Sequence, residues 1–169
     1  MPRALRVIAA ADRRGRPVAD TVILDYAQRS SNNVSVTGVK GGAYDIALHA
    51  AARLRTDDLL ELDDGRLIEV VAAPEALIEA RAADLPALAR VAWHLGDRHV
   101  PVQVLPNRIR VKRDEAVEVL LKALDAKLTV IEAPFEPEGG AYEAHAHAHH
   151  HDHAHDHHHG HAHGHHHHD

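Results

Sequence analysis

Hydrophobic and polar residues alternate in short runs between the N-terminus and Ala72, a pattern that predicts β-strands. Turn-forming segments such as Arg14-Gly15-Arg16 and Asp63-Asp64-Gly65 separate these runs. Residues 1–73 are therefore expected to form a small, two-layer β domain. The predicted strands are residues 5–8, 18–24, 34–39, 43–48 and 67–71.

The acidic pairs Asp57-Asp58 and Asp63-Asp64 are the carboxylate clusters of this first region. They could hold calcium or carry acid–base chemistry, but neither pair fits the spacing of a calcium loop. Both pairs are interpreted as surface turns.

The period of the apolar residues changes after Pro74 and predicts a second region of different architecture. Asp84 and Pro86 mark a helix start, Leu88 and Leu95 recur at helical spacing, and Gly96 is expected to end that helix. The predicted order is strand, helix, strand, strand, helix, strand, which is the ferredoxin-like arrangement, so the fold class is α+β. The strands are expected at residues 75–81, 102–105, 108–112 and 127–132, and Asp114 is expected to cap the second helix.

Residues 133–142 are expected to be a tether, because two prolines and two glycines interrupt helix and strand ladders. Phe135 and Tyr142 are its expected anchors. A ferredoxin-like domain of residues 74–144 would then be followed by a disordered tail of residues 145–169.

The last 25 residues contain 16 histidines, and the other nine are only Ala, Gly and Asp. Such a segment cannot bury enough apolar surface to fold. A purification tag is a poor interpretation, because the histidines alternate with Ala and Asp and the chain ends on Asp169 after four consecutive histidines. Neutral imidazole is a good ligand for Ni(II), Zn(II) and Cu(II), so the tail is expected to collect divalent metal.

Composition excludes several classes of function. The chain has no cysteine, which removes disulfides and thiolate metal sites. The formal net charge is −6, and every Lys and Arg precedes the tail, so the surface is a poor partner for nucleic acid. The apolar patch at residues 7–11 is too short for a signal peptide or a membrane span, so we expect a soluble cytoplasmic protein without a membrane partner.

Three histidines precede the tail: His49, His94 and His99. His49 has no companion ligand nearby and is interpreted as an ordinary histidine. His94 and His99 are five residues apart across a helix end, a spacing that does not place both on one helical face. His99 could instead interact with the negative end of the helix dipole. It could also pair with its own copy across a two-fold axis, which would turn one metal ligand into two.

The segment Trp93-His94-Leu95-Gly96-Asp97-Arg98-His99-Val100-Pro101-Val102-Gln103 resembles the hallmark of the urease accessory protein E family, which are nickel metallochaperones. The segment Pro134-Phe135-Glu136-Pro137-Glu138-Gly139-Gly140-Ala141-Tyr142 and the His-rich tail also resemble that family. The resemblance covers essentially the whole chain and is strongest after residue 90.

The resemblance implies a homodimer built through the ferredoxin-like domains, with His99 of each subunit binding Ni(II) as cargo. The β domain would resemble a peptide-binding chaperone module, and nickel would pass to the urease-accessory GTPase and the maturation complex with apo-urease. Zn(II) and Cu(II) would also bind, since imidazole alone does not select nickel. The metal-ligand candidates are His99, with His145, His147, His149, His150, His151 and His153 as auxiliary ligands. The candidates for the dimer interface are His94, Asp97, Arg98 and His99.

One departure from the family pattern concerns residues 110–115, where some members carry additional histidines and this chain has none. His145 and His147 are therefore our candidates to complete coordination around a His99 pair. Two alternatives remain at this point. A nickel or zinc store would need only the tail, and a metalloenzyme would recruit His94, His99 and Asp97 but lacks a convincing third ligand and general base. We expect no enzymatic activity.

Overall fold

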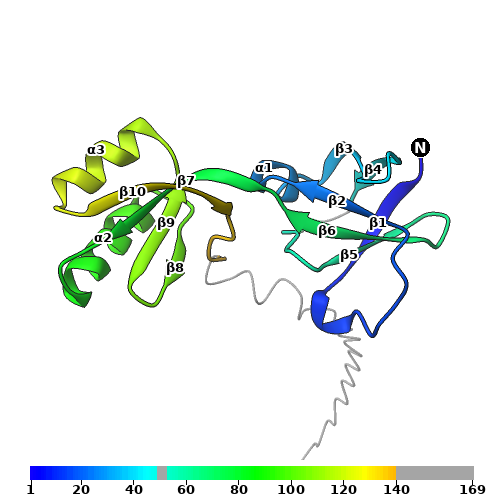
Figure 1. The fold of residues 1–169 in the computed structure, drawn as a ribbon, viewed down its shortest axis with the longest axis horizontal. Coiled ribbons are helices and arrows are strands. Elements are labelled where there is room, and N and C mark those ends of the chain that lie inside the picture. Colours follow the sequence, from blue (N-terminus) through cyan, green and yellow to red (C-terminus); the bar gives the residue numbers. More distant parts are fainter. Residues whose placement is uncertain (49–52, 140–169) are drawn as a thin grey trace, which may run out of the picture. The chain divides into compact units, whose positions relative to one another are not determined.

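The computed structural model describes residues 1–48 and 53–139 and shows a mixed α+β protein (Figure 1). Its described strands form two sheets, one of six strands and one of four. His49 and every histidine of the tail lie outside the described residues. Among the described residues, no helix is long and apolar enough to cross a membrane.

The six-stranded sheet contains all five strands predicted before Ala72. Its order is β2-β6-β5-β1-β4-β3, with β1 parallel to β4, β2 parallel to β6, and the other pairs antiparallel. All six strands belong to one hydrogen-bonded sheet, in which β1 bridges β5 and β4, and Val22 and Val36 of the two edge strands pack into one core. The strands are β1 (Arg3–Ile8), β2 (Asp20–Leu24), β3 (Asn33–Thr37), β4 (Ala43–Ala47), β5 (Leu59–Leu62) and β6 (Leu67–Ala72).

Three elements of this region were not predicted: β5, the short helix α1 (Tyr26–Arg29) and a 3-10 turn at Ala10–Asp12. Strand β5 is buried at three of its four positions, so its sequence does not alternate. Helix α1 is too short to show a period, but it begins with a capping box between Asp25 and Gln28.

Three buried polar or charged residues stand out among the described residues: Asp20, Arg29 and Asp58. Asp58 contradicts the interpretation of Asp57-Asp58 as a surface turn, since its carboxylate accepts hydrogen bonds from Ala10 N at 3.1 Å and Arg55 N at 2.8 Å. Burial raises the pKa of Asp58 above its usual value, although both hydrogen bonds oppose the rise. Asp58 thus connects two loops through hydrogen bonds, and we assign it a structural role.

The four-stranded sheet has the predicted element order and the strand order β10-β7-β9-β8, with every pair antiparallel. Strands β7 and β8 begin within one residue of the prediction, and two other boundaries differ by more. Helix α2 continues through Gly96 to Asp97, and β10 continues to Pro134, which an edge strand tolerates. The elements are β7 (Pro74–Arg81), α2 (Leu85–Asp97), β8 (Gln103–Leu105), β9 (Arg108–Lys112), α3 (Glu115–Ala123) and β10 (Lys127–Pro134).

One face of this sheet carries the core of the second region. Ile78, Ala80, Ile109 and Val111 point to the same side and form one buried cluster with side chains of both helices. The helix residues in that cluster are Leu88, Val91, Leu95 and Leu121. The opposite face of the sheet is therefore left without a helix.

Residues 134–138 form a strap that leaves β10 and reaches β8 at the other edge of the sheet. Phe135 is fully buried and lies edge-on to Tyr26, with ring centroids 5.3 Å apart. Glu138 N donates to Val102 O at 2.7 Å, just before β8. Phe135 is thus an anchor, as predicted, whereas Tyr142 lies outside the described residues.

Replacing Tyr44 by Phe is expected to destabilise the six-stranded sheet. Burial by itself would raise the pKa of Asp20, but hydrogen bonds from Lys40 N, Thr21 N and the Tyr44 hydroxyl, which lies 2.9 Å away, lower it. Losing the hydroxyl should reduce the free energy of unfolding by about 1–3 kcal/mol at neutral pH. A carboxyl group whose pKa is lowered in the folded protein stabilises the fold at pH values above its unfolded pKa of about 3.9. That stabilisation is lost as the pH falls through the folded pKa, so the stability difference between the variant and the original protein should shrink in acid.

Urea unfolding of Tyr44→Phe at neutral pH and at about pH 3 measures this difference. Tyr26→Phe is the matched control, because the Tyr26 contact with Phe135 is made by its ring and its hydroxyl makes no hydrogen bond to another described residue. Equal losses at both pH values would contradict the assigned role of the Asp20 carboxylate.

Candidate metal centre

Helix α2 positions the predicted metal-binding segment. Asp84 caps its start by accepting a hydrogen bond from Ala87 N at 2.8 Å. Leu88, Val91 and Leu95 then bury one face against the sheet. The C-terminal end of the helix is thereby fixed, and His94 and His99 are carried at that end.

His99 directly follows the helix in the left-handed backbone region, at φ 55°. His99 N donates to Gly96 O at 2.9 Å, and Val100 N donates to Leu95 O at 3.0 Å. This pair of bonds is a Schellman motif, with His99 at the position that usually belongs to glycine. Gly96 does not stop the helix, because the closing bonds and the packing of Val100 fix its end later in the chain.

The left-handed conformation costs an ordinary side chain about 1 kcal/mol, although histidine adopts it more often than most. The His99 side chain is exposed, so it makes no buried contacts that would offset this conformational energy. Helix α3 ends with the same motif, in which Asp125 stands at φ 55° and Ala126 N donates to Leu121 O at 3.1 Å. The motif therefore provides a rigid backbone from which the His99 imidazole extends into solvent.

An apolar stripe runs along the exposed flank of α2. Leu85, Ala89, Trp93 and Gly96 are all exposed and recur at helical spacing. The side chain of Trp93 is unusually open for a large aromatic residue, at 64% exposed. Gly96 faces open space, so the exposed stripe is flat at the end nearest His99. We define these four residues as the α2 stripe.

The other predicted residues of this helix end have identifiable contacts. The His94 ring packs edge-on against Trp93 with centroids 4.9 Å apart. The Arg98 guanidinium donates to His94 O at 3.0 Å and lies 3.8 Å from Asp97. The sequence located these residues by motif but missed the stripe, whose signal was the recurrence of Leu85, Ala89 and Trp93 every four residues.

Within residues 1–48 and 53–139, no group of three or more His, Cys, Asp or Glu side chains is arranged to hold a metal ion. The auxiliary ligands predicted in the tail lie beyond the described residues. They are His145, His147, His149, His150, His151 and His153.

The strap brings the chain back close to this helix end. Glu138 bonds to Val102 through its backbone and to Val104 N through its carboxylate, at 3.4 Å. Val102 follows His99 by only three positions, so Glu138 is held close to the loop that carries His99. This anchoring was not predicted, because its bonds join positions over 30 residues apart in sequence.

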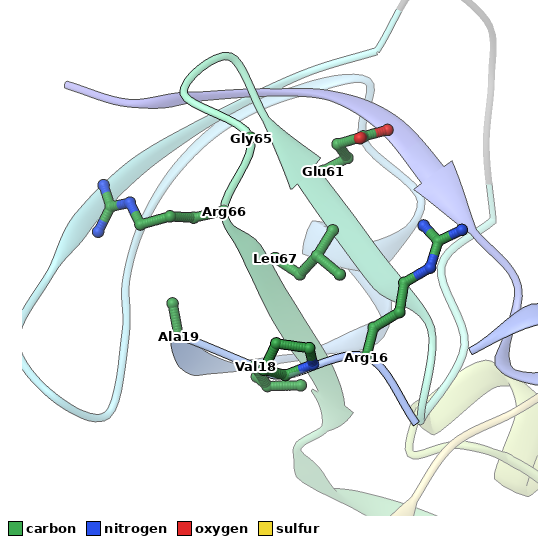
Figure 2. A pocket seen from close by; sticks show the side chains of 8 residues that line it. Arg16, Val18, Ala19, Glu61, Gly65, Arg66 and Leu67 are labelled. Carbon is green, nitrogen blue, oxygen red and sulfur yellow. The ribbon is translucent and has the colours of Figure 1, made fainter. Parts of the chain in front are cut away.

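A hollow on the six-stranded sheet is another feature that could bind a ligand (Figure 2). Its volume is about 480 Å³, and Arg16 and Arg66 extend to opposite sides of an apolar floor that includes Val18 and Leu67. Arg66 is paired with Asp64 at 2.7 Å. The hollow has no histidine in its lining, so it does not compete with His99 as a metal centre.

Comparison with known proteins agrees with the motif at the end of α2. A model of the UreE urease accessory protein C-terminal domain matches residues 75–169, more than half of the chain, and the N-terminal domain model matches residues 4–73.

Individual relatives give the same result. Urease accessory protein UreE of Bradyrhizobium sp. (strain BTAi1) is 48% identical over 142 residues, covering 84% of this chain and 68% of the relative. The protein of that name from Rhodopseudomonas palustris (strain HaA2) is 50% identical over 126 residues, 75% of this chain but 59% of the relative. The one from Chelativorans sp. (strain BNC1) is 41% identical over 86% of this chain and 90% of the relative. The resemblance seen in the sequence is confirmed, and the chain belongs to the urease accessory protein UreE family.

Proposed function

We propose that this protein is a nickel metallochaperone, which collects Ni(II) and delivers it to the urease maturation complex for assembly of the urease active site. Membership of an accessory protein family supports a role in urease maturation rather than catalysis. The observation that carries the nickel-binding part is His99, an exposed imidazole on a backbone closed by two hydrogen bonds.

The proposal includes a homodimer in which the His99 residues of two subunits share one metal ion. The α2 stripe supports it, because Trp93 and Leu85 expose apolar surface that a partner copy would cover. Gly96 in a helix costs roughly 0.5–1 kcal/mol relative to Ala, and close approach of a second backbone explains its use. His94, Asp97 and Arg98 would lie at the rim of this interface.

Tail histidines complete the proposed site. His145 follows Glu138 by seven positions, which gives the extended chain a reach of about 24 Å. Val102 follows His99 by three positions, a span of at most about 10 Å. Because Glu138 and Val102 are hydrogen-bonded, His145 and His147 are within reach of His99. His149, His150, His151 and His153 would add capacity.

The wider architecture belongs to the same proposal. Residues 74–144 would be a ferredoxin-like domain, residues 1–73 a partner-binding β domain, and residues 145–169 the metal-collecting tail. The strand order β10-β7-β9-β8 supports the ferredoxin-like assignment. The urease-accessory GTPase and apo-urease would be the partners, in the cytoplasm, while Zn(II) and Cu(II) would compete for the same imidazoles.

Storage of nickel or zinc is the second candidate function. The density of histidines after residue 144 favours it, since capacity alone requires no ordered site. A store, however, has no use for an exposed imidazole in a costly backbone conformation. Delivery and storage therefore differ in what they require of His99.

Nickel titration of the full chain, of a chain ending at Ala144 and of that shorter chain with His99→Ala separates the two functions. We expect the shorter chain to keep one tight site for every two subunits, and His99→Ala to abolish it. Calorimetry with simultaneous measurement of oligomer mass gives both quantities. Loss of all tight binding on removal of the tail would instead indicate a metal store.

Replacing Trp93 by Glu is expected to convert the metal-free dimer into a monomer, because it places a charge in the proposed apolar interface. Sedimentation equilibrium with a chelator present measures the mass. Val119→Glu is the matched control, since Val119 is a similarly exposed apolar residue on α3, at 63% exposed. A Trp93→Glu protein that remains dimeric would exclude the α2 stripe as the interface.

Replacing His99 by Gly is expected to stabilise the metal-free protein by about 0.5–1 kcal/mol while removing the tight nickel site. Glycine relieves the left-handed strain but supplies no ligand. Asp125→Gly relieves the same strain at the end of α3 and should leave nickel binding unchanged. Denaturant unfolding with a chelator gives the stability change, and a destabilised His99→Gly protein would show that the imidazole has a structural role.

A further inference from the structure

The face of the four-stranded sheet opposite the helices carries a cluster of cations. Glu79 on β7 points to this face, and Arg110, Arg108 and Arg81 gather around it with nitrogen–oxygen distances of 3.0, 3.1 and 2.9 Å. Lys127 lies directly opposite Arg81 in the β7–β10 register and so shares the face. We define Arg81, Arg108, Arg110 and Lys127 as the basic face.

Positive charge exceeds negative charge on this surface. Lys112 is paired with Glu75 at 2.6 Å, so Glu79 alone offsets the four cations of the basic face. The excess is therefore three positive charges, on a chain whose formal net charge is −6. The strap carries two further carboxylates, Glu136 and Glu138, which keep their negative charge; they accept hydrogen bonds from Thr56 N and Val104 N rather than from the cations of the basic face.

The carboxylate of Glu79 has too few acceptor sites for the guanidinium donors around it. It is largely buried, which by itself would raise its pKa, but hydrogen bonds from Arg110 and Arg81 and the charges of Arg108 and Arg110 lower the pKa. Each guanidinium has five N–H donors, whereas a carboxylate offers about four acceptor sites. The Nε of Arg108 is buried and makes no hydrogen bond of good geometry, although it lies 3.1 Å from Glu79. The buried Nε of Arg108 cannot reach an external acceptor, but the Arg81 side chain is 44% exposed and keeps donors available for one.

The spacing of these cations suits an extended anionic partner rather than one small anion. Arg108 and Arg110 are two positions apart on β9, a distance of about 6.7 Å along the strand. Arg81 is on β7 and Lys127 is on β10, and neighbouring strands are spaced about 4.8 Å apart. The strand residues around them on this face include Gln103, Leu105, Thr129 and Ile131 but no aromatic side chain on which a base could stack. Carboxylates borne on a polypeptide fit this surface better than nucleic acid does.

We propose that the basic face is a docking surface for an acidic segment of a partner protein, held by guanidinium–carboxylate hydrogen bonds. The interaction needs neither His99 nor the tail, and so it is independent of metal binding. Because it uses the face opposite the helices, it leaves the α2 stripe free. An acidic partner segment and a second copy of the chain could therefore be bound together.

Binding of a fluorescein-labelled oligo-glutamate peptide to the full chain, followed by anisotropy, tests the proposal. The measurement is made with a chelator at about pH 8, where the tail imidazoles are uncharged and metal-free. The peptide is expected to bind more tightly than a matched oligo-glutamine, and to weaken as salt is added. Arg81→Glu combined with Lys127→Glu should weaken binding by about tenfold or more, because it replaces two attractions with two repulsions.

Arg3→Glu combined with Arg90→Glu is the matched control, because it reverses two exposed arginines outside the basic face and changes the net charge equally. Arg81→Gln with Lys127→Gln is a milder variant should the reversal fail to fold. Nickel stoichiometry should be unchanged in both pairs, which separates this proposal from the metal-binding one. Equal binding of the two peptides, equal loss in the control, or tighter binding of single-stranded oligothymidine or inorganic phosphate would overturn it.

Discussion

The hydrogen bonds of the buried Arg29 guanidinium link the six-stranded sheet to the strap. It donates to Leu24 O and Leu54 O, at 3.3 and 3.1 Å, and to Phe135 O. Burial lowers the pKa of Arg29, while Glu136 and Glu75 oppose that shift, and an arginine pKa is high enough for the charge to persist. Three carbonyls far apart in sequence must converge on one cation, since a buried charge without partners is very costly. The strap is held in place at Phe135 as a consequence.

Local sequence signals were sufficient for most of the fold. Alternation located five strands of the first sheet, and Asp84 and Asp114 marked the helix starts that the structure shows. The wrong or missing predictions have a common cause: at these positions, tertiary contacts decide which residues are buried. Strand β5 is buried on both faces, and Asp58 is buried because Ala10 and Arg55 direct their N–H groups to it. Neither fact is visible in a single segment.

The site was less predictable from the residues alone. Two histidines five positions apart gave only a weak indication of a metal site, and the resemblance in residues 93–103 selected His99. Its left-handed conformation depends on the bonds of Gly96 and Val100, which no spacing rule anticipated. Which tail histidines act with His99 cannot be read from a repetitive sequence, because neighbouring imidazoles there are chemically equivalent.

The proposed function requires a protein that binds nickel firmly and still releases it. At the end of α2 the backbone of His99 is fixed, so little chain entropy remains to be lost when the imidazole becomes a ligand. The ring is exposed, so the coordination sphere stays accessible to an incoming ligand. Tail imidazoles on a long tether can dissociate one at a time, whereas a closed site on rigid elements must break all its bonds together. In the proposed site, a rigid exposed ligand supplemented by weaker ligands from the tail would therefore suit transfer better than permanent retention.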